Sequence, residues 1–192
     1  MEQKDYKLEV IEQLLKQPSH IRAIAKKLDI NHMMIKRKIH ELLNQNVVDY
    51  REEGKNKVYF LKKTIEAKAY VYMAENYKQI KILEIYPVLR KVFENLHKKN
   101  IKLAILFGSY AKKLAKKDSD VDVYIETTDK NLKKELELSD SKLSIKIGKF
   151  DKNNLLMKEI EKNHVIIKGI EEYYGFFEKD NFGGQAGISG SR

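Results

Sequence analysis

The stretch LFGSYAK, residues 106–112, together with DSDVDVYI, residues 118–125, decides the fold of the second half of this chain. The first stretch predicts a strand that ends at Phe107 and a helix that begins at Ser109. The unpaired N–H groups and positive dipole end of such a helix attract anions, and Gly108 leaves room for a phosphate beside the backbone. The hydroxyl of Ser109 adds one hydrogen-bond donor, so this turn predicts a phosphate-binding site.

The second stretch predicts a strand over residues 121–125 that carries two acidic side chains. Asp120 and Asp122 are two residues apart, so they project from one face of the strand while the alternate apolar residues bury the other face. Two carboxylates so close together repel each other unless a cation lies between them. Mg²⁺ with triphosphate oxygens as its remaining ligands meets that need, so the pair indicates metal-assisted nucleotidyl transfer.

These motifs resemble the signature of the DNA polymerase β-like nucleotidyltransferase superfamily. The signature is Gly108-Ser109, ten intervening residues and then Asp120-Val121-Asp122. The form GSYAK…DSDVDV is similar to that of the minimal nucleotidyltransferases within the superfamily. The resemblance covers about residues 100–170 and includes NHVIIKG, residues 163–169, which is similar to the end of that small domain.

The resemblance implies roles for five residues. Asp120 and Asp122 would be catalytic and would hold Mg²⁺, and Gly108 and Ser109 would bind the β- and γ-phosphates of ATP or another nucleoside triphosphate. Lys112 would neutralise charge on the leaving pyrophosphate, although a lysine on so lysine-rich a helix also fits a solvated position. The reaction would transfer AMP to a hydroxyl of a protein or small molecule. In minimal nucleotidyltransferases that act as antitoxins, that hydroxyl belongs to a tyrosine of a partner toxin.

This sequence departs from the superfamily at two places. Members usually carry a third carboxylate on a neighbouring strand, where it orients the attacking hydroxyl and helps to hold the metal. The strand predicted at residues 142–148 has Ser144 or Lys146 at that place, and Lys113 stands where relatives generally have Gly. The acidic residues that flank this strand are Asp140 and Asp151. A second interpretation therefore stays open, in which the domain keeps the fold and senses nucleotide without chemistry.

The composition limits the number of domains and the kind of partner. The chain has 192 residues, 42% of them hydrophobic and 34% charged, which suits one ordinary domain or two small ones. Lysine and arginine total 38 against 28 acidic residues, and this net charge of +10 favours nucleic acid or nucleotides as partners. Residues 1–100 hold 21 basic and 13 acidic residues, so most of the excess lies in the first half.

Several missing features narrow the class of protein. The chain has no cysteine, which excludes disulfides, thiolate zinc sites and cysteine nucleophiles. No apolar run reaches the ~18–20 residues that a transmembrane helix needs, and the charged start MEQKDYKLEV is unlike a signal peptide. We therefore expect a cytoplasmic protein without membrane contact. The excess of Lys over Arg and the frequent Ile favour an AT-rich archaeal or bacterial genome.

The first half of the chain predicts three short helices and a hairpin. The expected helices cover residues 8–15, 20–28 and 32–44, and the expected strands cover residues 47–50 and 57–61. Gln17-Pro18-Ser19 ends the first helix, and Ser19 is placed to cap the second. Two helices joined by a short turn and followed by a hairpin predict a winged helix-turn-helix, which resembles the winged-helix regulators common in prokaryotes.

The third expected helix carries three Lys or Arg, two His and no acidic residue through position 40. Its polar side faces a DNA major groove in this interpretation, and the hairpin turn at residues 51–57 adds cations as a wing, opposed by Glu52 and Glu53. The expected contacts with double-stranded DNA are Asn31, His32, Lys36, Arg37, Arg51, Lys55 and Lys57. The alternative is a solvated helix in a protein-docking module.

The fold class that follows is α+β, in four segments. They are a winged helix-turn-helix over 1–62, a helical connector over 63–99, a small nucleotidyltransferase-like α/β domain with a mixed sheet over 100–178, and a flexible tail or expression scar over 179–192. The connector predicts a break near Pro87 and a new helix over 87–98, and it fits either a homodimer contact or a plain spacer in a monomer. The domain predicts strands over 102–107, 121–125, 143–147 and 165–168, and helices over 109–115, 132–138, 153–161 and up to about 178. His164 is expected to be a cap or a core-edge residue.

Overall fold

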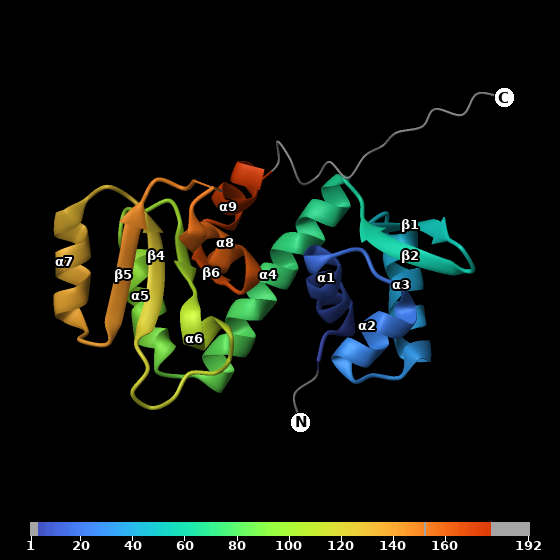
Figure 1. Ribbon diagram of the computed structural model, residues 1–192, viewed down its shortest axis with the longest axis horizontal. Coiled ribbons are helices and arrows are strands. Elements are labelled where there is room, and N and C mark those ends of the chain that lie inside the picture. Colours follow the sequence, from blue (N-terminus) through green and yellow to red (C-terminus); the bar gives the residue numbers. More distant parts are fainter. Residues whose placement is uncertain (1–3, 152, 178–192) are drawn as a thin grey trace. The chain divides into compact units, whose positions relative to one another are not determined.

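The computed structural model describes residues 4–151 and 153–177, and these form two compact units (Figure 1). One unit holds the described residues up to Ala74, and the other holds residues Glu75–Phe176. The expected tail over 179–192 lies outside the described residues. Within the described residues, no helix is both long and apolar enough to cross a membrane.

The first unit is a winged helix-turn-helix, and its helices and strands follow one another directly along the chain. They are α1 (Tyr6–Lys16), α2 (Ile21–Leu28), α3 (His32–Asn44), β1 (Val48–Glu53), β2 (Asn56–Leu61) and the first part of α4 (Ile65–Ile85). Helix α3 has the predicted bounds, because the Asn31 side chain caps its first turn while Ile35 and Ile39 are fully buried. The strands β1 and β2 pair antiparallel, with Val48 opposite Leu61.

Two details of the first unit correct the sequence-based expectation. Ser19 does not cap α2, because its backbone N–H donates to the Tyr59 carbonyl and its carbonyl accepts from the Tyr59 N–H, both at 2.9 Å. His20 is the N-cap of α2 instead, without a side-chain capping bond. The hairpin turn is also shorter than residues 51–57, because β1 continues to Glu53 and β2 already begins at Asn56.

The second unit contains a four-stranded mixed sheet, as predicted, in the order β5-β4-β3-β6. The strands are β3 (Ala104–Leu106), β4 (Val121–Glu126), β5 (Leu143–Gly148) and β6 (Val165–Lys168). β4 runs parallel to β5, and β3 runs antiparallel to both of its neighbours. The helices are the second part of α4, α5 (Leu89–Lys98), α6 (Gly108–Ala111), α7 (Lys130–Ser139), α8 (Leu155–Lys162) and α9 (Ile170–Phe177).

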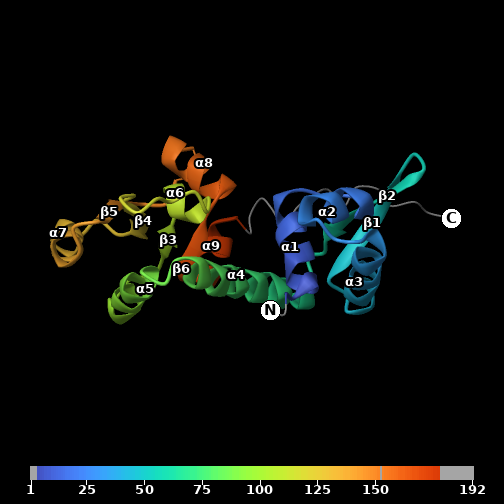
Figure 2. The same cartoon turned by 90° about the horizontal axis from the view of Figure 1, so that it is seen from below.

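Helices cover both faces of this sheet (Figure 2). On one face, the alternate residues Val121, Val123 and Ile125 of β4 pack in one core with Leu89, Val92, Phe93 and Leu96 of α5 and with Ile82 of α4. On the other face lie α6 and α8 (Figure 2). Because side chains alternate along a strand, the residues of β4 that lie between these three point toward the opposite face, which carries α6 and α8.

Several element boundaries differ from the expectation in this unit, and those of α5, β3 and α6 have a structural reason or affect the site. Helix α5 begins at Leu89 rather than at Pro87, since residues 86–89 form a turn in which the Leu89 N–H donates to the Tyr86 carbonyl at 3.0 Å. Strand β3 covers only residues 104–106 of the expected 102–107. Helix α6 ends at Ala111 rather than at residue 115, because Lys113 has a left-handed backbone with φ of 60°.

Candidate nucleotide-binding site and DNA-facing surface

The turn between β3 and α6 lies directly against the acidic strand β4. The Phe107 N–H donates to the Asp122 carbonyl at 3.0 Å, and Gly108 has a left-handed φ of 69°. A Cβ atom at position 108 would lie 2.3 Å from Asp122 Oδ2 and 3.0 Å from its Cγ, so the Asp122 side chain would have to move away from the turn. Glycine is therefore needed for two reasons: its backbone conformation, and the close approach of the Asp122 carboxylate to the turn.

Asp122 is partly buried and surrounded by charged groups. Burial raises the pKa of Asp122 above its usual value, and the negative charges of Asp120 and Glu159 raise it further. The Ser144 hydroxyl, hydrogen-bonded to this carboxylate, and the Lys146 ammonium act in the opposite direction and lower the pKa. The balance leaves negative charge that a bound cation would stabilise.

The donor set fits a hard divalent cation. Asp120 is exposed and Asp122 is half-buried, so their carboxylate oxygens are accessible to a metal ion from solvent. Mg²⁺ prefers one or two carboxylates and completes its shell with water and phosphate oxygens. In residues 4–151 and 153–177, no group of three or more His, Asp or Glu side chains lies close enough to hold a metal ion. Asp120 and Asp122 would therefore hold Mg²⁺ together with oxygens of a nucleotide.

The other residues predicted for this site lie around α6. Ser109 is half-buried in its first turn, and its carbonyl accepts from the Leu114 N–H at 2.9 Å. Lys112 follows the helix, and its Nζ lies 2.9 Å from Oε1 of Glu159 on α8. Both residues thus lie on the segment that begins with the Gly108 turn.

The structure also shows what the neighbouring strand contributes. In the parallel register of β4 and β5, Ser144 lies opposite Asp122. The flanking carboxylates serve local turns: Asp140 accepts from the Lys142 N–H at 3.0 Å, and Asp151 accepts from the Asn153 N–H at 2.9 Å. The charge near Asp122 that the sequence did not indicate is Glu159. No spacing signal could have found it, because it lies 37 residues further along the chain on another element.

The predicted DNA-facing side of α3 is exposed in the first unit. The exposed positions are Asn31, His32, Met33, Lys36, Arg37 and His40, while Ile35 and Ile39 are buried. The Asn31 side-chain oxygen accepts from the Met33 N–H at 2.8 Å, so its capping function competes with a base contact. The Arg37 side chain is 65% exposed; it lies 3.9 Å from Glu41 Oε1 and donates to Met34 Sδ at 3.2 Å.

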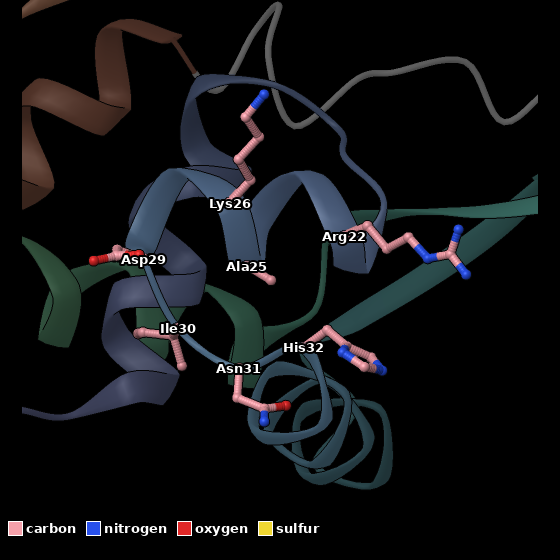
Figure 3. Close-up of a pocket in the computed structure, with 7 residues that line it drawn as sticks. All are labelled: Arg22, Ala25, Lys26, Asp29, Ile30, Asn31 and His32. Atoms are coloured by element: carbon pink, nitrogen blue, oxygen red, sulfur yellow. The ribbon is translucent and has the colours of Figure 1, made fainter.

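Two basic side chains that the sequence did not single out lie beside this helix. A hollow of about 430 Å³ at the turn between α2 and α3 is lined by Arg22, Ala25, Lys26, Asp29, Ile30, Asn31 and His32. Arg22 and His32 extend toward the same side of it (Figure 3). Helix α2 thus adds Arg22 and Lys26 to the basic surface at the start of α3.

The wing residues are held by contacts within the hairpin. Arg51 Nε lies 2.7 Å from Glu53 Oε1, so its charge is already paired. Lys57 Nζ lies 3.9 Å from the centre of the Tyr50 ring, a cation–π contact. Lys55 is exposed in the turn.

Comparison with protein families assigns the second unit. Residues 88–173 match the family described as "Polymerase beta, Nucleotidyltransferase". This match includes β3, α6 and β4, and therefore the whole Gly108-Ser109…Asp120-Val121-Asp122 arrangement. The predicted resemblance is confirmed over this segment, which matches the nucleotidyltransferase family and follows the winged helix-turn-helix of the first unit in the chain. A comparison with curated proteins found no match.

Two solved structures that resemble part of the chain are described as a possible transcriptional regulator and a repressor. A homodimeric winged helix-turn-helix DNA-binding domain from Mycobacterium bovis, a possible ArsR-family regulator, has a TM-score of 0.34 at 18% identity over 36% of this chain. The adhesin competence repressor from Streptococcus pyogenes has a TM-score of 0.39 at 16% identity over 46% of this chain. The chain covers 65% and 66% of these two proteins. Because both TM-scores are low, the description of the first unit rests on its own elements.

Proposed function

We propose that this protein binds double-stranded DNA through its first unit and transfers AMP from Mg²⁺-bound ATP to a hydroxyl through its second. The observation that carries the transferase proposal is the contact of Asp122 with the Gly108 turn, where a Cβ atom would lie 2.3 Å from Asp122 Oδ2. This contact supports the proposal because it sets the Asp122 carboxylate, which would bind the metal, beside the turn that would bind phosphate. The family match over residues 88–173 supports the same class of reaction.

Each residue of the site has its own role in the proposed reaction. Gly108 and Ser109 bind the β- and γ-phosphates, and Lys112 offsets negative charge on the pyrophosphate. Asp120 and Asp122 would hold Mg²⁺, which supplies positive charge to the triphosphate when it is bound. The acceptor oxygen forms a bond to the α-phosphorus, and the bond from that phosphorus to the bridging oxygen breaks. Pyrophosphate leaves with the bridging oxygen, and the hydroxyl proton passes to a carboxylate of the site.

The transferase proposal is tested by incubation with α-labelled ATP, Mg²⁺ and candidate acceptors, including small-molecule hydroxyls and the tyrosines of a partner toxin. We expect label transfer that falls at least ~100-fold in Asp122→Asn, because one charged metal ligand is lost. Asp118→Asn is the matched control, since it removes one charge from an exposed position in the loop just before β4. Transfer that is absent from the wild type, or equal in Asp122→Asn, would contradict the proposal.

A second candidate function is regulation of DNA binding by nucleotide without transfer. The observation in its favour is Ser144, which lies opposite Asp122 where relatives usually carry a carboxylate. This candidate predicts no label transfer but a change in DNA affinity when Mg²⁺-ATP is added. Gel-shift titrations with and without Mg²⁺-ATP distinguish the two candidates.

The DNA-binding proposal is supported by the exposed basic side of α3 and by Arg22 and Lys26 beside it. Contacts with phosphates release counterions, so binding should weaken steeply as the salt concentration rises, by a logarithmic slope of ~0.9 for each phosphate contact. A gel-shift titration across salt concentrations measures that slope. Binding that is absent, or that does not respond to salt, would refute DNA recognition by this surface.

A further inference from the structure

The nucleotidyltransferase site lacks a carboxylate on the strand beside Asp122. Ser144 occupies the paired position on β5 and donates a hydrogen bond to Asp122, and the next residue on the same face, Lys146, is a cation. Asp140 and Asp151 are both engaged in local turns. A third carboxylate for this site therefore has to come from another element.

Helix α8 presents a carboxylate to the same region. Met157 and Ile160 anchor this helix in the core, being 2% and 0% exposed. Glu159 lies between these two anchors in sequence but is half-exposed, and its Oε1 is 2.9 Å from Lys112 Nζ. α6 and α8 lie beside each other on one side of the sheet, as Figure 2 shows and as this ion pair requires. The charge of Glu159 also acts on Asp122.

The ion pair between Glu159 and Lys112 is easily exchanged. The two side chains are 49% and 37% exposed, and water screens an ion pair so open to solvent. A nucleoside triphosphate carries several negative charges and is a stronger partner for one lysine than a single carboxylate. When the phosphates take Lys112, Glu159 loses its partner and its flexible side chain is free to turn toward Asp122.

We propose that Glu159 is the third carboxylate of this site, held by Lys112 until a nucleoside triphosphate takes the lysine and then joining Asp120 and Asp122 around the divalent cation. This inference rests on the proposed transferase function. Among the described residues these three carboxylates do not form a group that could hold a metal ion, so Glu159 has to turn away from Lys112 to join Asp120 and Asp122.

The test measures binding of Mn²⁺, as a paramagnetic substitute for Mg²⁺, by electron paramagnetic resonance on the full chain. With a non-hydrolysable ATP analogue present, Glu159→Gln should weaken Mn²⁺ binding about 10-fold or more, because one charged ligand is missing. Without nucleotide, Glu159→Gln should change Mn²⁺ binding less than about 2-fold, because Lys112 already occupies Glu159. Glu161→Gln removes the same charge from an exposed position on α8 and should bind like the wild type.

Three further variants show whether Glu159 is a ligand of the metal or only a structural residue. Lys112→Ala should strengthen nucleotide-free Mn²⁺ binding several-fold, because it releases Glu159, and the gain should vanish in the Lys112→Ala/Glu159→Gln double variant. Ser144→Asp, which places a carboxylate opposite Asp122, should restore Mn²⁺ binding to Glu159→Gln.

The outcomes separate this inference from the proposed function. If Glu159→Gln binds Mn²⁺ and nucleotide like the wild type, or if Lys112→Ala brings no gain, the assignment of Glu159 is wrong while the transferase proposal stands. If the wild type binds no Mn²⁺ in the presence of nucleotide, both are wrong.

Discussion

The two candidate sites of this protein differ in how their side chains are held. In the second unit, Asp122 is wedged against the Gly108 backbone and bound by Ser144, so its position is determined by the packing of β3, β4 and β5. In the first unit, Arg37 is 65% exposed and touches only neighbours on its own helix. A site that binds a small ligand must be preformed, whereas a surface that binds DNA is completed by its partner.

The units also differ in their buried polar groups. The second unit buries Glu75, which is 1% exposed. Lys78 Nζ lies 2.6 Å from its Oε2, and the Tyr174 hydroxyl donates to its Oε1 at 2.7 Å. His164 Nε2 lies 4.0 Å from the same Oε1. His164 was expected to be a cap or a core-edge residue; its side chain is 11% exposed, and its Nδ1 lies 2.8 Å from the carbonyl oxygen of Ile160 in the last turn of α8. The described histidines of the first unit, His20, His32 and His40, are exposed.

This difference predicts that the second unit loses stability at low pH. This is the largest of the effects that we expect. Burial and the charge of Lys78 lower the pKa of His164 to about 4. Since its value in the unfolded chain is about 6.5, the stabilisation is complete above pH ~6.5 and falls as the pH drops toward 4, by about 3 kcal/mol in all. Glu75 and the backbone carbonyl of Ile160 attract the proton and partly oppose the loss.

Hydrogen exchange followed by mass spectrometry, corrected for the intrinsic exchange rates, measures this effect in each unit. Protection of peptides from residues 75–176 should fall between pH 7 and pH 4.5, and peptides from residues 4–74 should lose less. His164→Gln is the control and should flatten the pH dependence of the second unit. An equal loss of protection in both units would contradict the assignment of this pH dependence to His164.

Gly108→Ala tests whether the turn at Gly108 holds the Asp122 side chain in a fixed position. The added Cβ would lie 2.3 Å from Asp122 Oδ2 on a left-handed backbone, so we expect a loss of about 2–3 kcal/mol in stability and of nucleotide binding. Urea unfolding followed by circular dichroism and a fluorescent ATP analogue measure the two losses. Gly175→Ala is the matched control, because nothing lies within 4 Å of a Cβ there. Wild-type nucleotide affinity in Gly108→Ala would show that Asp122 is not held by this turn.

Arg37→Ala tests the opposite property in the first unit. It should weaken DNA binding by about 1–2 kcal/mol and leave stability nearly unchanged, because the side chain is 65% exposed. Gel shifts at constant salt measure the DNA affinity. Arg90→Ala, an exposed arginine of the second unit, is the control that should bind DNA like the wild type. If both variants bind equally well, α3 does not read the DNA through Arg37.

Lys113→Gly should have the smallest effect, a gain of about 0.5–1 kcal/mol in stability. Lys113 has a φ of 60°, a conformation that costs a lysine more than a glycine. Asp29 in the first unit has a φ of 54°, yet aspartate tolerates it better, so Asp29→Gly should gain less. Thermal unfolding of the two variants compares these gains. A larger gain from Asp29→Gly would contradict the assignment of strain to Lys113.

The sequence by itself determined the features that depend on neighbours in the chain. Strand alternation placed Val121 and Val123 in the core and left Asp122 to face α6, because successive side chains of a strand point to opposite faces. The bounds of α3 were predictable because the Asn31 cap and the spacing of Ile35 and Ile39 act within a few residues.

Only the tertiary structure decided the contacts between distant segments. The pairing of Ser19 with Tyr59, and of Lys112 with Glu159, joins residues 40 and 47 positions apart. No periodicity or capping rule covers such separations, because they depend on how the β2 strand and the α8 helix dock after they form. The turn at Gly108 was thus encoded locally, whereas the ion pair of Lys112 with Glu159 depends on the packing of α8 beside the segment that follows α6.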